Sequence, residues 1–332
     1  MPKKIDWDLL AGRRLHLRQL HVFLAVVQHG SMAMAARQLG VSTPTVSEIL
    51  AHLEQVVGVK LLDRSPKGVE PTRYGQALRR RALIVFDELK QGINEIELLA
   101  DPGAGEVRIA CPLGIARSIV PHIFEQFAKQ HPRVVLHFDE VVADSTTRDL
   151  GALRDRKYDL ILGRGGLSLD DSSRADLDVH PLFDDRLVIV AGGRSKWSGS
   201  RRKLNLADLV AEPWILQATQ TGNYRILAQG FAACGLAVPE AQLVTTSMSV
   251  ITHFLARGPF LTAIPWSVAH YESLKILAVD VPAPPWPVNI VTLKHRIIGP
   301  TTAAFIECAR DFTKPLRERP RGLPGVVGSE HR

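Results

Sequence analysis

The sequence has few cysteines and no long hydrophobic run. Cys111, Cys234 and Cys308 are its only cysteines, and their wide spacing fits neither a disulfide framework nor a metal cluster. No apolar run approaches the roughly 20 residues that a membrane-spanning helix needs. Lys3 and Lys4 are not followed by the apolar stretch of a secretion signal. We therefore expect a protein of the reducing cytoplasm without a membrane partner.

The motifs of common enzyme classes are also missing. The sequence has no Walker run, no GxGxxG that opens a helix after a strand, no HExxH, no CxxC and no GxSxG. GRGG at 163–166 is too short for a nucleotide loop, and the twelve histidines lack metal-ligand spacing. We expect neither enzymatic activity nor a cofactor or metal ion.

The positive charge of the chain is concentrated at one end. The 332 residues have a net charge of +7 from 41 basic and 34 acidic side chains. Residues 1–81 contain 13 basic and 6 acidic residues, and the remainder contains 28 of each. A basic segment joined to a neutral one is typical of a polyanion-binding module, although a solvated basic surface has the same composition. The length favours a small domain followed by a larger one.

Residues 17–57 have the pattern of a helix-turn-helix. An apolar stripe over residues 17–27 predicts a first helix that ends near Gly30. Ser31 is placed to cap a short Ala-rich helix, and Gly40 is placed for the left-handed turn that ends it. Ser42 or Thr43 then caps the next helix. An ordinary helical hairpin is the alternative.

The third helix would display small polar residues at its start. Thr43, Thr45, Ser47 and Glu48 fall outside its buried stripe, and Pro44 is acceptable in the first turn. In a helix-turn-helix such residues enter the major groove and meet base edges.

The segment that follows, 59–72, reads as a strand, a Pro-Lys-Gly turn and a second strand. This is the pattern of a wing, with Arg64, Lys67 and Arg73 available to phosphates or a minor groove. A solvated basic hairpin is the alternative.

Residues 17–75 resemble the DNA-binding domain of LysR-type transcriptional regulators. The matching positions are Phe23, Gly30-Ser31, Ala35-Ala36, Leu39, Val41-Ser42, Ser47, Leu53-Glu54, Gly58, Leu61-Leu62, Arg64, Thr72 and Gly75. The resemblance implies DNA contacts from Thr43, Pro44, Thr45 and Ser47, and contacts of Arg64 and Lys67 with the backbone or minor groove. Thr43 stands where the family usually has an amide, and Glu48 where it often has a basic residue. Residues 1–14 are an extension that the pattern does not require.

Residues 74–99 contain no proline and predict a helix of roughly 37 Å with an extended apolar face. Such a face favours pairing with a second copy of itself. In the family this linker helix dimerises, so the resemblance implies a homodimer or homotetramer.

We therefore assign 1–73 to the winged helix-turn-helix, 74–100 to the linker helix and 101–105 to a hinge. Residues 106–312 form the effector-binding domain and 313–332 a tail.

Residues 106–312 alternate strand and helix patterns, which predicts a mostly parallel α/β sheet. The expected strands are 106–111, 134–141, 158–163, 185–192, 213–217, 243–247, 261–265 and 287–294, and the expected helices include 118–131 and 146–157. This part also resembles the effector domain of the family. The resemblance implies two α/β lobes, similar to periplasmic binding proteins and joined by two crossovers. Lobe one would be 106–181 plus 284–312, and lobe two 182–283.

Ligands of open α/β sheets bind beyond the carboxyl ends of the strands. The candidate effector residues by this rule are Pro112, Leu113, Gly114, Ser145, Thr146, Thr147, Arg164, Gln217 and Thr262. Gly114 and Thr146 match ligand-contacting positions of the family, although a hydroxyl residue is common where Gly114 stands. Arg164 can bind a carboxylate through two hydrogen bonds, which favours an organic acid as effector. A surface or interlobe ion pair is the alternative for Arg164.

The fold class expected is α/β, with a helix-rich winged N-terminal domain, a long linker helix and a two-lobed C-terminal domain. The function expected is a bacterial transcription regulator that binds double-stranded DNA, responds to a small-molecule effector and contacts RNA polymerase. A pyridoxal enzyme fused to the helix-turn-helix would need a larger second domain than the roughly 200 residues present. An architectural DNA binder whose C-terminal domain only oligomerises is the other alternative.

Overall fold

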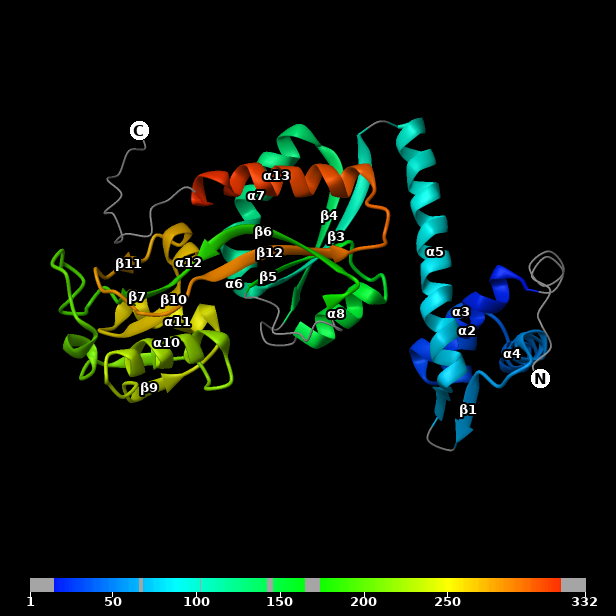
Figure 1. The fold of residues 1–332 in the computed structure, drawn as a ribbon, viewed down its shortest axis with the longest axis horizontal. Helices are drawn as coiled ribbons and strands as arrows, with labels where there is room; N and C mark the ends of the chain where they lie inside the picture. Colours follow the sequence, from blue (N-terminus) through cyan, green and yellow to red (C-terminus); the bar gives the residue numbers. More distant parts are fainter. Residues whose placement is uncertain (1–14, 66–67, 102, 142–145, 165–173, 318–332) are drawn as a thin grey trace. The chain divides into compact units, whose positions relative to one another are not determined.

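A computed structural model describes residues 15–65, 68–101, 103–141, 146–164 and 174–317 (Figure 1). Contacts divide the chain into two compact units, Met1–Ile96 and Glu97–Arg332. Among the described residues, every helix is too short or too polar to span a membrane. Each unit is built around its own apolar core.

The first unit is a winged helix-turn-helix, as predicted. It contains α2 (Leu17–His29), α3 (Met32–Leu39), α4 (Thr43–Val57), β1 (Leu62–Ser65) and β2 (Gly68–Pro71). Phe23, Val46 and Leu53 are fully buried where the three helices meet. The Ser31 hydroxyl accepts the N–H of Met34, and Gly40 ends α3 in the left-handed conformation. The local capping signals therefore fix the turn between α3 and α4.

Two connections hold the wing against the helices. The N–H of Val69 donates to the carbonyl oxygen of Gly30 at 2.8 Å. Gly68 has φ 131°, and a Cβ there would lie 2.8 Å from the same oxygen. The carboxylate of Glu54 accepts the backbone N–H groups of Leu61 at 2.8 Å and Leu62 at 3.2 Å. The wing therefore keeps a fixed position beside α4.

The long helix α5 (Arg73–Ala100) follows the wing. Thr72 precedes it, and the Thr72 hydroxyl accepts the N–H of Gly75 at 3.1 Å. Gly75 lies so close to the wing that a Cβ would be 2.1 Å from the carbonyl oxygen of Leu61. Further along, α5 has a stripe of exposed apolar side chains at helical spacing, made of Val85, Leu89, Ile93, Ile96 and Leu99.

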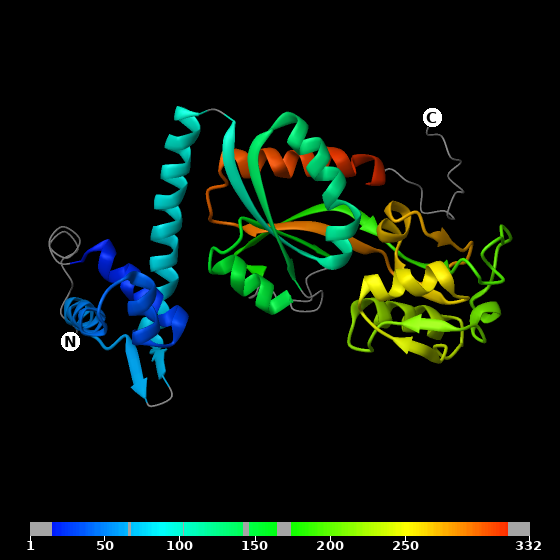
Figure 2. The ribbon, with the colours of Figure 1, turned by 180° about the vertical axis from the view of Figure 1, so that it is seen from behind.

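The second unit contains two five-stranded sheets (Figures 1 and 2). The first has the order β4-β3-β5-β12-β6, from β3 (Ala104–Pro112), β4 (Arg133–Val141), β5 (Leu160–Arg164), β6 (Leu177–Asp185) and β12 (Trp286–Leu293). Helices α6 (Leu113–Ser118), α7 (Val120–Gln130) and α13 (Pro300–Arg317) pack with one face. Helix α8 (Thr146–Arg154) packs on the other.

The second sheet has the order β11-β7-β10-β8-β9. Its strands are β7 (Leu187–Ala191), β8 (Trp214–Leu216), β9 (Ala241–Val244), β10 (Leu261–Pro265) and β11 (Lys275–Ile276). The 3-10 helix η1 (Leu206–Leu209) and α10 (Gly222–Ala233) pack on one face. Helices α11 (Met248–Arg257) and α12 (Trp266–Tyr271) pack on the opposite face. The two-lobed α/β architecture is confirmed.

The prediction of mostly parallel sheets is wrong, because both sheets are mixed. β3 runs parallel to β4 and β5, but β12 runs antiparallel to β5 and β6. In the second sheet β7 is antiparallel to β10 and β11, whereas β8 is parallel to β9 and β10. The reversed strands β7 and β12 are those that enter each sheet after a crossing from the other. Only Arg186 separates β6 from β7.

Candidate nucleic-acid interface and effector site

The start of α4 combines a firm cap with exposed side chains. The Ser42 hydroxyl accepts the N–H of Thr45 at 3.3 Å and lies 2.8 Å from the Thr45 hydroxyl. The sequence allowed either Ser42 or Thr43 as the N-cap of α4, and in the structure it is Ser42. Thr43 and Pro44 are exposed in the first turn, while Thr45 is half-buried. One turn later Ser47 is half-buried and Glu48 is exposed. These positions are open to a partner that approaches the end of α4.

The wing brings a basic residue to the same place. Arg64 is exposed on β1, and its Nη1 lies 3.4 Å from the Ser47 hydroxyl. A guanidinium and the first two turns of α4 thus share one surface, although they are 17 positions apart in the chain. Lys67 lies outside the described residues. Arg73 belongs to α5, where its guanidinium lies 4.6 Å from the centroid of the Tyr74 ring.

Arg164 lies in a buried cluster between the two sheets of the second unit. Its Nη2 is 2.9 Å from the Asp185 carboxylate and 2.8 Å from the Ser267 hydroxyl. The exposed fractions of the Arg164 and Asp185 side chains are 8% and 0%. Burial lowers the pKa of Arg164, and the Asp185 charge opposes that shift. Arg164 therefore forms a buried ion pair between the ends of β5 and β6 of the first sheet, and of these two contacts only the hydrogen bond to Ser267 reaches α12 on the second sheet. An ion pair was the alternative that the sequence left open for Arg164.

Asp185 is the centre of this cluster. Its carboxylate also accepts the hydroxyl of Ser267 at 2.6 Å, the N–H of Ser267 at 3.2 Å and the N–H of Arg186 at 2.9 Å. These bonds join the end of β6 to α12. An ion pair of 2.8 Å between Arg117 and Glu272 also joins α6 to the chain just after α12. A buried carboxylate with this many donors is well compensated. The Ser118 hydroxyl lies 3.5 Å from that of Ser267. We name Gly114, Ser118, Arg164, Asp185 and Ser267 the Arg164 cluster.

Gly114 in α6 belongs to the cluster because it leaves room for the guanidinium. A Cβ at Gly114 would lie 2.8 Å from Nη1 of Arg164 and 3.7 Å from Val268. The absence of the hydroxyl residue that the family often has here is thereby explained, since Arg164 occupies the space. Pro112 is the last residue of β3. Leu113 packs against the core that α11 and α12 form on the second sheet.

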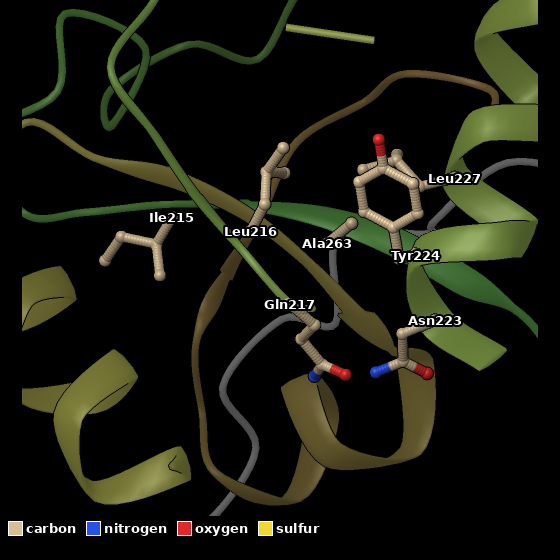
Figure 3. Close-up of a pocket in the computed structure, with 7 residues that line it drawn as sticks. All are labelled: Ile215, Leu216, Gln217, Asn223, Tyr224, Leu227 and Ala263. Carbon is tan, nitrogen blue, oxygen red and sulfur yellow. The ribbon is translucent and has the colours of Figure 1, made fainter. Parts of the chain in front are cut away.

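The two candidates from the second sheet lie apart from each other. Gln217 lines a small pocket with Ile215, Leu216, Asn223, Tyr224, Leu227 and Ala263. Figure 3 shows the side-chain amides of Gln217 and Asn223 among the residues that line this pocket. Thr262 precedes Ala263 on β10, and successive strand residues point to opposite faces. Its hydroxyl is buried and has no hydrogen-bond partner among the described residues.

The structure does not describe the side chains of the candidate residues that follow β4. Ser145 lies outside the described residues. Thr146 begins α8, but its side chain and that of Thr147 are also outside them. The structure thus brings Gly114 and Arg164 together, places Gln217 in a separate pocket and buries Thr262. Within the described ranges, no group of three His, Cys, Asp or Glu side chains is arranged to hold a metal ion.

Asp185 and Ser267 are the residues that sequence reasoning missed. Their role depends on Arg164, and Ser267 is 103 positions away from it. A buried Asp at the end of a strand gives no periodic signal that could have identified it.

The exposed start of α4, the wing and the two-sheet domain define a DNA-binding transcriptional regulator with an effector-binding domain. The model of the bacterial regulatory helix-turn-helix protein, lysR family, matches residues 17–76. The model of the LysR substrate binding domain matches residues 100–314. The chain belongs to the LysR family of transcriptional regulators.

Curated relatives share this organisation over most of their length. The chain is 28% identical over 299 residues to the HTH-type transcriptional regulator TdcA of Escherichia coli K12, which covers 89% of this chain and 93% of that protein. It is 27% identical over 315 residues to the HTH-type transcriptional regulator GbpR of Azospirillum brasilense, which covers 92% and 89%.

Solved structures show the same fold. Full-length OxyR from Pseudomonas aeruginosa, in a variant with one cysteine replaced by aspartate, matches with a TM-score of 0.62 and 22% identity, covering 94% of this chain and 98% of that one. Full-length CbnR complexed with its target DNA matches with a TM-score of 0.52 and 21% identity, covering 90% and 100%.

Proposed function

We propose that the regulator reads its promoter with Thr43, Pro44, Thr45 and Ser47, and contacts phosphates or a minor groove with Arg64 and Lys67. The observation that carries this proposal is the position of Arg64 beside Ser47, with 3.4 Å between Nη1 and the hydroxyl oxygen, on an exposed surface. A recognition helix inserts its first turns into the major groove, where short polar side chains reach base edges. Glu48, exposed on the same turns, can accept a hydrogen bond from a cytosine amino group.

Selection of binding sites from a random DNA library tests this arrangement. Thr43→Ala, Ser47→Ala and Glu48→Arg should each change the preferred base at one position, with a discrimination of about 1–3 kcal/mol per good contact. Gln55→Ala is a matched control, because Gln55 is exposed near the opposite end of α4. Unchanged preferences in all three variants would refute the docking of α4 in the major groove.

The protein should act as a homodimer or homotetramer held together by α5. Its stripe from Val85 to Leu99 is exposed, and Leu99 is 78% exposed. An isolated helix with such a face is expected to pair with a second copy. Ile93→Glu should lower the mass measured by light scattering. Glu95→Lys, on the same helix, is the control.

The effector should be a small organic acid that binds beside the Arg164 cluster. The contacts of Arg164 with Asp185 and Ser267 both use Nη2. Nε is buried and has no hydrogen-bond partner among the described residues. An anionic ligand can therefore bind the Nε and Nη1 side of the guanidinium, or it can displace Asp185 from Nη2. Gly114 contacts Arg164 and belongs to the proposed site, together with Pro112 and Leu113 directly before it in the chain. Ser145 and Thr146 are proposed from the sequence alone. Gln217 lines a separate pocket and Thr262 is buried, so neither is included beside the Arg164 cluster.

A thermal-shift screen of organic acids tests the proposal, because a ligand that binds only the folded state raises its stability. The stabilisation should be smaller for Thr146→Val and lost for Arg164→Met. A neutral sugar or an amine as the only ligand would remove the case for an acid. If no ligand shifts stability or footprint, the C-terminal domain serves oligomerisation alone and the protein is architectural.

The regulator should work in the cytoplasm by binding rather than by catalysis. Effector binding would change the angle between the sheets and hence the contact of the complex with RNA polymerase. In vitro transcription with purified polymerase, with and without the acid found in the screen, measures this output. Unchanged transcript levels at saturating ligand would contradict the regulatory role of the effector.

A further inference from the structure

The loop between β7 and η1 is strongly basic. Residues 194–203 contain five basic residues and no acidic one, and we name them the basic loop. Arg194, Lys196, Arg201, Arg202 and Lys203 are all exposed. Residues 82–332 contain equal numbers of basic and acidic residues, so outside this loop they have an excess of five acidic side chains. The loop is therefore a local positive surface on an otherwise acidic part of the chain.

Trp197 fixes the loop to the domain. It is half-buried against the core of the second sheet. Lys196 and Arg202 both place their charged groups 5.2 Å from the centroid of its ring. The N–H of Trp197 donates to the Ser195 hydroxyl, and that of Ser200 to the carbonyl of Trp197. Cations that are already ordered lose less conformational entropy when they bind a partner.

Most of these cations have no acidic partner. Lys196 forms an ion pair with Glu212 at 2.5 Å. In the part of the chain that the structure describes, no carboxylate pairs with Arg194, Arg201, Arg202 or Lys203. Within the loop Ser198, Gly199 and Ser200 are small, and no atom would lie within 4 Å of a Cβ at Gly199. A bulky anionic chain can therefore approach the free cations closely.

We propose that the basic loop is a second DNA-contacting surface, which binds phosphates of double-stranded DNA outside the site read by α4. Several adjacent Arg and Lys side chains on an exposed loop suit a continuous row of phosphates, and they need no base sequence to bind it. A single phosphorylated residue would be better served by a pocket with convergent donors. The loop would then lengthen the DNA footprint of the regulator without changing its sequence preference.

Salt dependence of DNA binding by the full chain tests the proposal. The probe is a duplex selected from a random library and extended by about three helical turns on each side, at roughly 10 bp per turn. In Arg201→Gln/Arg202→Gln/Lys203→Gln, the slope of log K against log salt should fall by roughly 0.9 per lost contact. The control Lys129→Gln/Lys294→Gln/Lys314→Gln removes the same charge from exposed positions elsewhere and should keep the slope. Arg201→Lys/Arg202→Lys should keep it as well.

Photocrosslinking locates the contact. Ser200→Cys, made in a Cys234→Ser background and labelled with an aryl azide, should crosslink the flanks of the duplex. Lys314→Cys in the same background should not. An unchanged slope, an equal loss in the control or an absent crosslink would each overturn the proposal. An unchanged slope together with altered transcription would also overturn it and would assign the loop to a protein partner.

Discussion

At the start of α4 the polar side chains face solvent, whereas between the two sheets of the second unit the charged side chains are buried. Ser42, Thr45 and Arg64 make contacts with residues at most 17 positions away. Arg164 and Ser118 instead reach Ser267, 103 and 149 positions away. The first surface is available to a partner, and the second already satisfies its own charges. Substitutions should therefore change binding at the first surface and stability at the second.

The largest effect is expected from Asp185→Ala. It leaves the buried guanidinium of Arg164 without its partner, which should lower the free energy of unfolding by about 3–5 kcal/mol. Chemical denaturation of the full chain measures the loss. Asp184→Ala is the matched control, because Asp184 is the exposed neighbour on the same strand and should change little.

The paired replacement sharpens this result. Arg164→Met/Asp185→Leu removes both charges and should be clearly more stable than Asp185→Ala alone, since no buried charge is left unpaired. Equal losses in the two proteins would mean that the ion pair is not what holds the Arg164 cluster together.

Gly75→Ala should show that the first unit is also tightly packed behind its exposed surface. The new Cβ would be placed 2.1 Å from the Leu61 carbonyl oxygen, so the wing or α5 must move, at a cost of about 1–3 kcal/mol. DNA affinity should fall with stability because the wing is displaced. Gly92→Ala is the control on the same helix, where a Cβ meets no atom within 4 Å. Equal behaviour of the two variants would contradict the close contact.

Arg64→Ala should affect binding alone. Arg64 is exposed and its contact with Ser47 is long, so the free energy of unfolding should stay within about 0.5 kcal/mol of the parent. The slope of log K against log salt should fall by roughly 0.9 for the lost phosphate contact. Lys314→Ala, in α13, should leave the slope intact. A large loss of stability in Arg64→Ala would erase the contrast between the two regions.

The smallest expected effect concerns the chemical reactivity of Cys111, which lies in β3 shortly before Gly114 of the Arg164 cluster. Burial, with a further contribution from Glu140, raises the pKa of the Cys111 thiol to about 12. The reactive thiolate should therefore stay scarce in the folded protein until the pH approaches that value. At pH 8 an alkylating reagent should label Cys234, which is exposed, and spare Cys111 and Cys308. Rapid labelling of Cys111 would show that this buried part of the domain is often exposed to solvent.

The fold of the first unit was predictable because its signals are local. Ser31, Gly40 and Gly58 cap or end helices within a few residues of themselves. The second unit was harder. Strand β6 was not expected because Pro181 and acidic residues at its end break the strand pattern. The antiparallel strands follow from crossings between sheets, which the order of strands and helices does not reveal.

The candidate sites divide in the same way. The exposure of Thr43, Pro44 and Glu48 follows from helical periodicity. The partner of Arg164 does not, because a carboxylate at the end of β6 and a hydroxyl of α12 meet it only after both sheets have formed. The sequence grouped Arg164 with Gly114, but it could not choose between a ligand and an ion pair for Arg164, and it did not identify Asp185 as the partner.

Arg186 alone separates β6 from β7, and this short crossing limits how the two sheets can move. Its N–H is held by Asp185 and its carbonyl oxygen accepts the N–H of Trp266 at 2.7 Å. The returning chain contains Pro282, Pro284 and Pro285, whose φ angles are restricted. One sheet therefore cannot slide past the other without breaking these bonds. The change of angle between the sheets that we propose for effector binding would have its axis near Arg186, so that a small displacement at the ligand would produce a large one at the distant ends of the sheets.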